Sequence, residues 1–247
     1  MHNGGIAEFE RIKRRLQALL PDEMFAVPQG NTDSEWAFAL FLSLLPATAK
    51  ANDTFTPHVL RQAMLDTIKT LNSLARDAGI TEPSLMNFCV TDGETVVATR
   101  YISSKTDEAA SLYFSSGTTF SEYAPGGHYR MQKLDKRENI IMIASEPLTF
   151  EKGRVSRLGS SDFHTDFLRF AADWMEIRTN TMIVITPKMN LLQIPIIDEF
   201  YVPPSDPLSG KRGVEFATQK GLFNPKTSPF QAAETPPAST ARLTAST

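Results

Sequence analysis

The order of the periodic segments is the feature that most constrains the fold of this chain. Three early stretches, residues 6–20, 36–45 and 57–79, are rich in apolar side chains, and in the first and third these recur at three- and four-residue steps. That spacing is typical of helices that bury one face. Pro21 ends the first pattern, the second is apolar nearly all round and predicts a buried helix, and Gly79 ends the third. The first third of the chain is therefore expected to be helical.

After residue 84 the pattern changes to short runs rich in β-branched and aromatic residues. The stretch "SLMNFCVTDGETVVATRYIS" contains two such runs around Asp92-Gly93, which predicts a β-hairpin. Further strands are predicted in "AASLYFSSG", "YRMQKLD", "NIIMIASEPL" and on both sides of a turn near residues 187–190. Because helices come first and mostly antiparallel strands follow, we expect an α+β fold with helices packed on a sheet.

Composition excludes several classes of function. The net charge is −3 and no long basic block occurs, so the chain is not expected to bind nucleic acid. No apolar stretch approaches the roughly 20 residues of a membrane span, and no signal peptide precedes the first helix. The single cysteine, Cys89, rules out an internal disulfide framework. These features predict a cytoplasmic protein, and the scattered histidines predict no metal site. No cofactor is expected either.

Two short polar motifs precede the first two helices. "HNGG" comes before the first, where small polar residues and glycines expose backbone N–H groups, although on spacing alone a frayed terminus is the better interpretation of Asn3 and Gly4. "NTDSEW" opens the second helix, with Thr32 or Asp33 as the N-cap and Glu35 in the first turn, where the helix dipole favours an acid.

Taken in order, "HNGG", "NTDSEW", "NFCVTDGETVVATRY" and "IIMIASEPL" resemble the class II glutamine amidotransferases, which are N-terminal-nucleophile hydrolases. The resemblance covers about residues 1–202 and is nearest to the fungal glutathione-degradation subunit of that family. It implies a four-layer αββα sandwich. This chain would hold the helices and the later strands of that sandwich and would be missing its first strands.

The resemblance also assigns roles to residues of the two motifs. It implies that the Asn3 side-chain amide and the Gly4 backbone N–H form an oxyanion hole, and that Asp33 accepts hydrogen bonds from the α-ammonium group of the substrate. His2 is expected to be a loop residue without a catalytic role. Glu146, at the end of a predicted strand, is a weaker candidate to face the site.

The family's nucleophile is an N-terminal cysteine whose own α-amino group acts as the base. The sequence begins at the "HNGG" motif, so we expect the chain to lack the nucleophile, as an N-terminally truncated fragment would, and to be inactive alone. Cys89 cannot replace it, because Cys89 lies within a predicted strand and its amino group is in a peptide bond; it is expected to be a small core residue.

The activity that the resemblance implies is hydrolysis of a γ-glutamyl amide, with glutathione as the expected substrate and a metallopeptidase-like subunit as the expected partner. Two alternatives stay open. One is a glutaminase that supplies ammonia to a synthase, and the other is a non-catalytic scaffold or regulatory subunit. A cysteine upstream in the reading frame would favour the enzyme, and its absence would favour the scaffold.

Two segments depart from the family pattern. Residues 153–172 separate "SEPLTFEK" from "ADW", and we interpret them as an insertion or a translated, unspliced intron. Residues 203–247 are rich in proline, serine and threonine and poor in aliphatic residues, which predicts a disordered tail.

Overall fold

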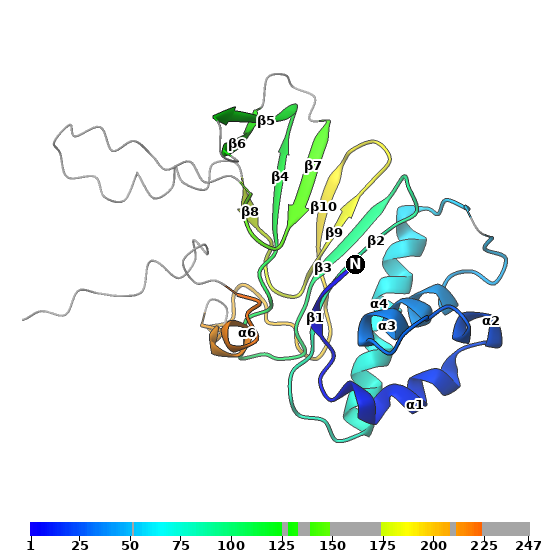
Figure 1. The fold of residues 1–247 in the computed structure, drawn as a ribbon. Coiled ribbons are helices and arrows are strands. Elements are labelled where there is room, and N and C mark those ends of the chain that lie inside the picture. The colour runs from blue at the N-terminus through cyan, green and yellow to red at the C-terminus, as the bar shows by residue number, and fades with distance from the viewer. Residues whose placement is uncertain (51, 125–127, 133–138, 149–173, 208–210, 224–247) are drawn as a thin grey trace, which may run out of the picture.

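A computed structural model of the chain describes residues 1–50, 52–124, 128–132, 139–148, 174–207 and 211–223. Helices cover one face of a five-stranded sheet, and a three-stranded sheet lies against its other face (Figure 1). The predicted α+β class is thereby confirmed. The described ranges form one helical layer and two sheets, and the four-layer sandwich stays a prediction.

Four helices come first in the chain, and their ends follow the sequence rules. Their bounds are α1 Phe9–Leu19, α2 Asp22–Phe25, α3 Asp33–Ser43 and α4 Pro57–Asp77. Thr32 is the N-cap of α3 and forms a capping box with Glu35. Helix α4 starts with proline at its first position, and Gly79 follows its end at φ 66°, where the Ile80 N–H bonds back to the Ala75 carbonyl.

Helix α3 differs from its prediction on one side. Trp36, Leu40 and Phe41 are buried, as expected, but Phe38 is 45% exposed. The helix packs on α1, α2, α4 and β1 and leaves one face to solvent. A helix that is apolar nearly all round is thus only partly covered by the described residues.

The five-stranded sheet has the order β1-β2-β3-β9-β10, and every neighbouring pair is antiparallel. Its strands are β1 His2–Gly5, β2 Leu85–Thr91, β3 Val96–Arg100, β9 Thr181–Ile185 and β10 Leu191–Pro195. The predicted hairpin at Asp92-Gly93 is confirmed, because it joins β2 to β3. Strand β1 is at one edge of this sheet.

The second sheet has the order β7-β4-β8, and a separate hairpin pairs β5 with β6. The strands are β4 Tyr113–Gly117, β5 Thr119–Ala124, β6 His128–Gln132, β7 Ile140–Ala144 and β8 Met175–Glu176. Strand β5 was not predicted from the sequence. None of the described helices is long and apolar enough to cross a membrane.

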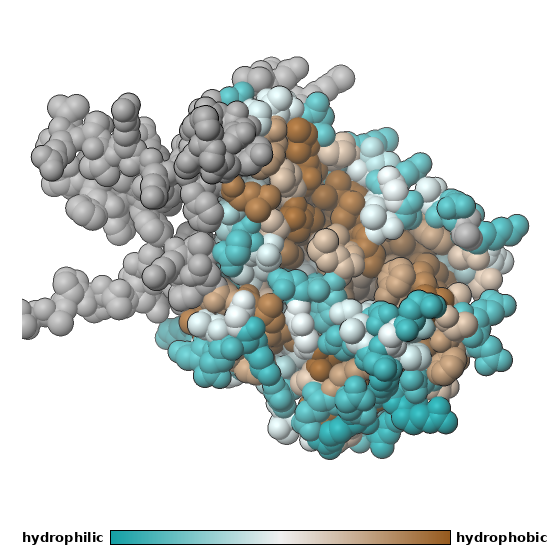
Figure 2. All heavy atoms as spheres, in the orientation of Figure 1, coloured by the Kyte–Doolittle hydropathy of each residue, from teal (hydrophilic) through white to brown (hydrophobic). Residues whose placement is uncertain are grey.

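Two apolar cores hold the layers together. The larger one joins the helices to the five-stranded sheet and includes Ile12, Leu16 and Met86, and a smaller one lies between the sheets around Phe114 and Ile183. Apolar atoms also reach the surface in a band on the side that carries the N-terminus (Figure 2), where β7 is only half-buried along its whole length. An edge with an incompletely covered apolar face is an aggregation hazard.

The segment after residue 210 corrects part of the predicted disordered tail. Helix α6 (Glu215–Gln219) follows Gly213, which bridges to Asp107, and Ala217 and Phe223 are buried. Prediction from composition fails here because a few apolar side chains are enough to order a segment when the rest of the fold already offers a surface on which they can pack. Residues 224–247 and the predicted insertion at 153–172 lie outside the described residues.

Candidate functional site at the edge strand

Asn3 and Gly4 lie in a regular strand, β1, and not in an irregular loop before the first helix. Asn3 is in register with Asn87 of β2, and Gly4 is in register with Met86. His2, expected in a loop, belongs to the same strand. The first motif is therefore held along one whole side by backbone pairing with β2.

The pairing determines which backbone donors of β1 are free. Met1 and Cys89 exchange two N–H···O bonds of 2.9 Å, so they form a hydrogen-bonded pair. Such pairs alternate along an antiparallel ladder, which directs the Asn3 N–H toward β2. By the same alternation the Gly4 N–H points away from β2 to the open edge of the sheet.

A close backbone approach requires glycine at position 4. A Cβ atom added to Gly4 would lie 2.0 Å from the carbonyl oxygen of Leu85, whereas one added to Gly5 would meet nothing within 4 Å. Gly4 is therefore constrained by β2, and its neighbour is not.

The side chains of β1 alternate between the two faces of the sheet. The His2 ring packs against Phe88 on the helix side, with 4.6 Å between ring centroids. Asn3 therefore faces the second sheet, as does its register partner Asn87, whose side-chain amide donates to the Ala110 carbonyl at 3.0 Å. The half-buried Asn3 carboxamide has no hydrogen-bond partner among the described residues, and its donors are available.

Asp33 is tied to the end of β1. Its Oδ2 atom accepts a 2.8 Å hydrogen bond from the backbone N–H of Ile6, and its Oδ1 atom accepts one of 2.8 Å from the N–H of Ser34. Because Thr32 caps α3, the Asp33 carboxylate is not used as the cap. The structure thus joins the two predicted motifs, with Asp33 on the helix side of the strand and the Asn3 side chain on the other.

Sequence reasoning missed the pairing of His2 with Ser34. The His2 Nδ1 atom lies 2.9 Å from the Ser34 hydroxyl, and Nε2 lies 3.1 Å from the Leu85 carbonyl. Both residues line an apolar cavity of about 230 Å³ together with Phe38, Phe41 and Phe88. Desolvation in this site lowers the pKa of His2 below 6.5. No local pattern identifies a contact between residues 32 positions apart.

Two other predicted residues are less central. Cys89 is half-buried within β2, and burial raises the pKa of its thiol, as expected for a core residue. Glu146 accepts a 2.9 Å hydrogen bond from the Ser111 hydroxyl. Ser111 follows Ala110, so Glu146 lies on the side of the sheet that Asn87 faces and not beside Asp33. Within the described ranges, no group of three His, Cys, Asp or Glu side chains could hold a metal ion.

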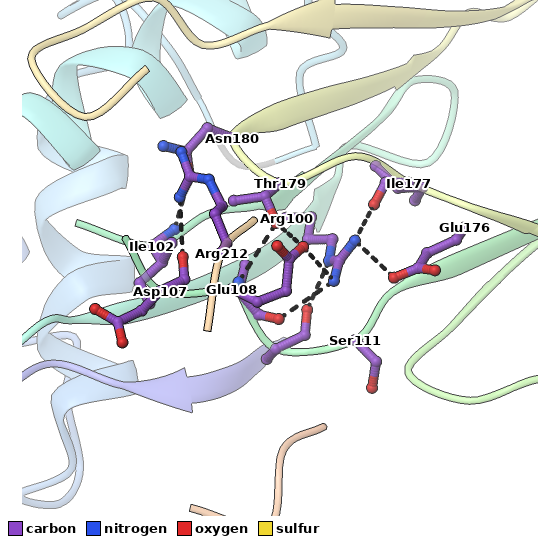
Figure 3. A network of polar contacts seen from close by, with 12 residues as sticks. Arg100, Ile102, Asp107, Glu108, Ser111, Glu176, Ile177, Thr179, Asn180 and Arg212 are labelled. Carbon is purple, nitrogen blue, oxygen red and sulfur yellow. Dashed lines mark hydrogen bonds and ion pairs between the residues drawn. The ribbon is translucent and has the colours of Figure 1, made fainter. Parts of the chain in front are cut away.

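A buried ion network supports the far side of the site (Figure 3). Arg100, which is 1% exposed, pairs with Glu108 and Glu176 at 3.0 Å each. It also donates to the carbonyls of Ala110 and Ile177. Because Ala110 accepts the Asn87 amide as well, the network fixes the segment against which the partner of Asn3 rests.

Comparisons with known proteins support this description. No family model matches the chain. The chain is 45% identical over 231 residues to the probable glutamine amidotransferase DUG3 of Saccharomyces cerevisiae, and the alignment covers 90% of this chain and 58% of that protein. The chain thus spans less than two thirds of the length of this curated relative.

A solved structure has a similar fold. It is that of a glutamine aminotransferase class-II domain protein from Silicibacter pomeroyi, which matches with a TM-score of 0.50 and 24% identity over 80% of this chain and 67% of that one. At this identity the likeness concerns the fold alone. The yeast relative agrees with the family that the ordered motifs predict, since in sequence the chain is similar to a probable glutamine amidotransferase.

Proposed function

We propose that this chain supplies the oxyanion-binding and substrate-binding parts of a site that hydrolyses γ-glutamyl amides. The observation that carries the proposal is the hydrogen bond from the Ile6 N–H to the Asp33 carboxylate. It fastens the start of α3 to the end of β1, so that an anionic group and the free donors of Asn3 and Gly4 stand on one connected unit.

Asn3 and Gly4 are the proposed oxyanion donors. The Gly4 N–H points to the open edge, and the Asn3 side-chain amide has no partner among the described residues. When a nucleophile attacks the γ-carbonyl, its oxygen becomes an anion, and donors held in place stabilise that charge without reorganising. One such donor is worth about 3 kcal/mol in acyl transfer.

Asp33 is the proposed acceptor for the α-ammonium group of the substrate. Each of its oxygens accepts a backbone N–H in the structure; Oδ2 keeps a second lone pair, and the Ser34 hydroxyl lies 3.3 Å from Oδ1. A carboxylate already fixed by two backbone donors would bind an ammonium group without losing side-chain freedom. Charge-assisted hydrogen bonds of this kind are about twice as strong as neutral ones.

The nucleophile is not Cys89, because that thiol is half-buried within a strand and its pKa is raised. We therefore expect the chain alone to bind a γ-glutamyl compound without turning it over. The sequence resemblance supports glutathione as the substrate, a metallopeptidase-like subunit as the partner and the cytoplasm as the location. The name of the yeast relative supports the broader class, glutamine amidotransferase.

Calorimetric titration of the full chain tests this proposal. L-Glutamine and glutathione should bind, and 4-carbamoylbutanoate, which lacks the α-ammonium group, should bind at least about tenfold more weakly. Asp33→Asn keeps an oxygen acceptor for the Ile6 N–H but removes the charge. It should abolish the preference for glutamine, and the exposed Asp22→Asn serves as the matched control.

Two outcomes would contradict the proposal. One is equal binding of glutamine by the native chain and by the Asp33→Asn variant. The other is no binding of either γ-glutamyl compound, which would favour the scaffold alternative. Release of glutamate above that of the heat-denatured chain would refute the expected inactivity of the chain alone.

A further inference from the structure

We propose that His2 and Ser34 are a pair of positioning residues that controls how many hydrogen bonds the Asp33 carboxylate accepts from the protein. The inference rests on the proposed role of Asp33 as the acceptor for the substrate's α-ammonium group. It adds that ligand binding depends on the protonation of His2. His2 lies on β1 and contacts Ser34 of α3, 32 residues further along the chain.

The hydrogen bonds of His2 determine its tautomer. The Leu85 carbonyl, 3.1 Å from Nε2, can only accept, so Nε2 carries the hydrogen. In the neutral ring Nδ1 is then an acceptor, and the Ser34 hydroxyl, 2.9 Å away, is its donor. The ring is held on its other side by the stacking contact with Phe88.

The Ser34 hydroxyl has a single proton and two acceptors within reach. Its oxygen lies 2.9 Å from His2 Nδ1 and 3.3 Å from Asp33 Oδ1. While His2 is neutral, the shorter contact directs the proton to Nδ1, and the Ser34 N–H at 2.8 Å is then the main donor to Asp33 Oδ1. When solvent supplies a proton to Nδ1, that new N–H donates to the Ser34 oxygen, and the hydroxyl proton turns to Asp33 Oδ1.

The two states differ in what they offer a ligand. With His2 neutral, Asp33 Oδ1 keeps a lone pair for an ammonium group. With His2 charged, that lone pair is occupied by the Ser34 hydroxyl, and a positive ring stands beside the site. Protonation of His2 should therefore weaken the binding of α-ammonium ligands, and binding should be strongest when the ring is neutral.

The surroundings of His2 favour the neutral ring at neutral pH. Asp33 faces it from α3, the Glu35 carboxylate of the same helix bonds to Thr32, and the amino group of Met1 lies next to it on β1. The neighbours from β2 and α4 are uncharged: Phe88, Val90, Met64 and Thr67. Burial outweighs the attraction of Asp33, and the pKa of His2 is lowered.

Nitrogen NMR of the histidine rings tests the pair without any ligand. His2 should show the Nε2–H tautomer, and Ser34→Ala should change both its Nδ1 shift and its pKa. Ser43→Ala, a half-buried serine of the same helix that bonds only to the Leu40 carbonyl among the described residues, should change neither. A Nδ1–H tautomer in the native chain, or a His2 pKa unchanged by Ser34→Ala, would overturn the pair.

The pH dependence of binding tests its function. From pH 8 to pH 5 the native chain should lose about fivefold or more of its affinity for L-glutamine, the effect of one hydrogen bond, with a midpoint at the NMR pKa of His2. Binding of 4-carbamoylbutanoate should show no such step, and Ser34→Ala should reduce the step for glutamine by at least half.

The results separate the two proposals. If the Ser34→Ala variant keeps the full pH-dependent change in glutamine affinity, the Ser34 hydroxyl does not link His2 to Asp33, even if Asp33 binds glutamine as proposed. No binding of glutamine at any pH would refute the ligand role of Asp33, and with it the function of the pair, whatever the tautomer of His2.

Discussion

The carboxylate of Asp33 accepts a 2.8 Å hydrogen bond from the backbone N–H of Ile6, which follows the edge strand β1. The two residues belong to different motifs of the sequence, "HNGG" with the residue after it and "NTDSEW". This contact makes the edge strand and the start of α3 a single unit. The stability and the reactivity of the site depend on how firmly this unit is held.

The two glycines of β1 should differ sharply in tolerance. Gly4→Ala places a methyl group 2.0 Å from the Leu85 carbonyl oxygen, and it should lower the free energy of unfolding by about 1–3 kcal/mol. It should also speed hydrogen exchange of the Cys89 amide, which bonds to Met1. Gly5→Ala, with open space at its Cβ, is the matched control, and equal behaviour of the two variants would contradict the pairing of β1 with β2.

The two threonine caps should also differ. Thr32 accepts the Glu35 N–H and completes a capping box, whereas Thr56, at the N-cap of α4, makes no side-chain cap bond. Thr32→Ala should cost about 1 kcal/mol of the free energy of unfolding, and Thr56→Ala only a few tenths. Urea denaturation of both variants measures the difference, and an equal cost would show that the capping box does not stabilise α3.

Removing the charge of Arg100 should be among the most damaging single changes. Its buried guanidinium pairs with Glu176, which is 3% exposed at its side chain, and with Glu108. Arg100→Leu removes the buried cation that pairs with both carboxylates and should cost about 3–5 kcal/mol. Breaking the exposed pair of Arg76 and Glu199 with Arg76→Leu should cost at most about 1 kcal/mol. Similar denaturation midpoints for the two variants would refute this ranking.

The lowered pKa of His2 predicts a pH dependence of stability. In the unfolded chain His2 titrates near 6.5, and in the folded chain it titrates lower. Between these two values the unfolded state binds more protons, so the free energy of unfolding should fall as the pH falls from 6.5 to the folded pKa, and no further below it. His2→Gln should remove this part of the slope, and the exposed His58→Gln should not. A slope unchanged in His2→Gln would contradict the burial of the ring.

The Cys89 thiol should react slowly in the folded chain. Burial raises its pKa, so less thiolate is present at pH 8 than in the unfolded chain, and β2 limits access to the sulfur. Alkylation by iodoacetamide should be about tenfold slower in native buffer than in urea. Because Cys89 is the single cysteine, total labelling reports it directly, and equal rates would reopen its assignment as an unreactive core residue.

Helix ends and turns that are set by residues close together in the sequence could be predicted. The helix ends at Thr32, Pro57 and Gly79 follow from capping chemistry, and the hairpin at Asp92-Gly93 follows from turn preference. The segment around α6 was not predictable, because its few apolar residues become buried only where Leu85 and Ile102 form a surface for them. Strand β5 was also missed, although its partner β6 is close in the chain, because "TFSEYA" lacks a regular alternation of apolar and polar residues.

For the site, the sequence by itself determined the chemistry: an amide and a glycine N–H as donors, a carboxylate at a helix start, and the family to which these motifs point. Only the tertiary structure decided which of these groups are free. Pairing with β2 leaves the Gly4 N–H at an open edge, packing of α3 brings Ser34 to His2, and the fold buries Arg100 behind Asn87. These outcomes depend on contacts between residues far apart in the chain, and the spacing of neighbouring residues carries no information about such contacts.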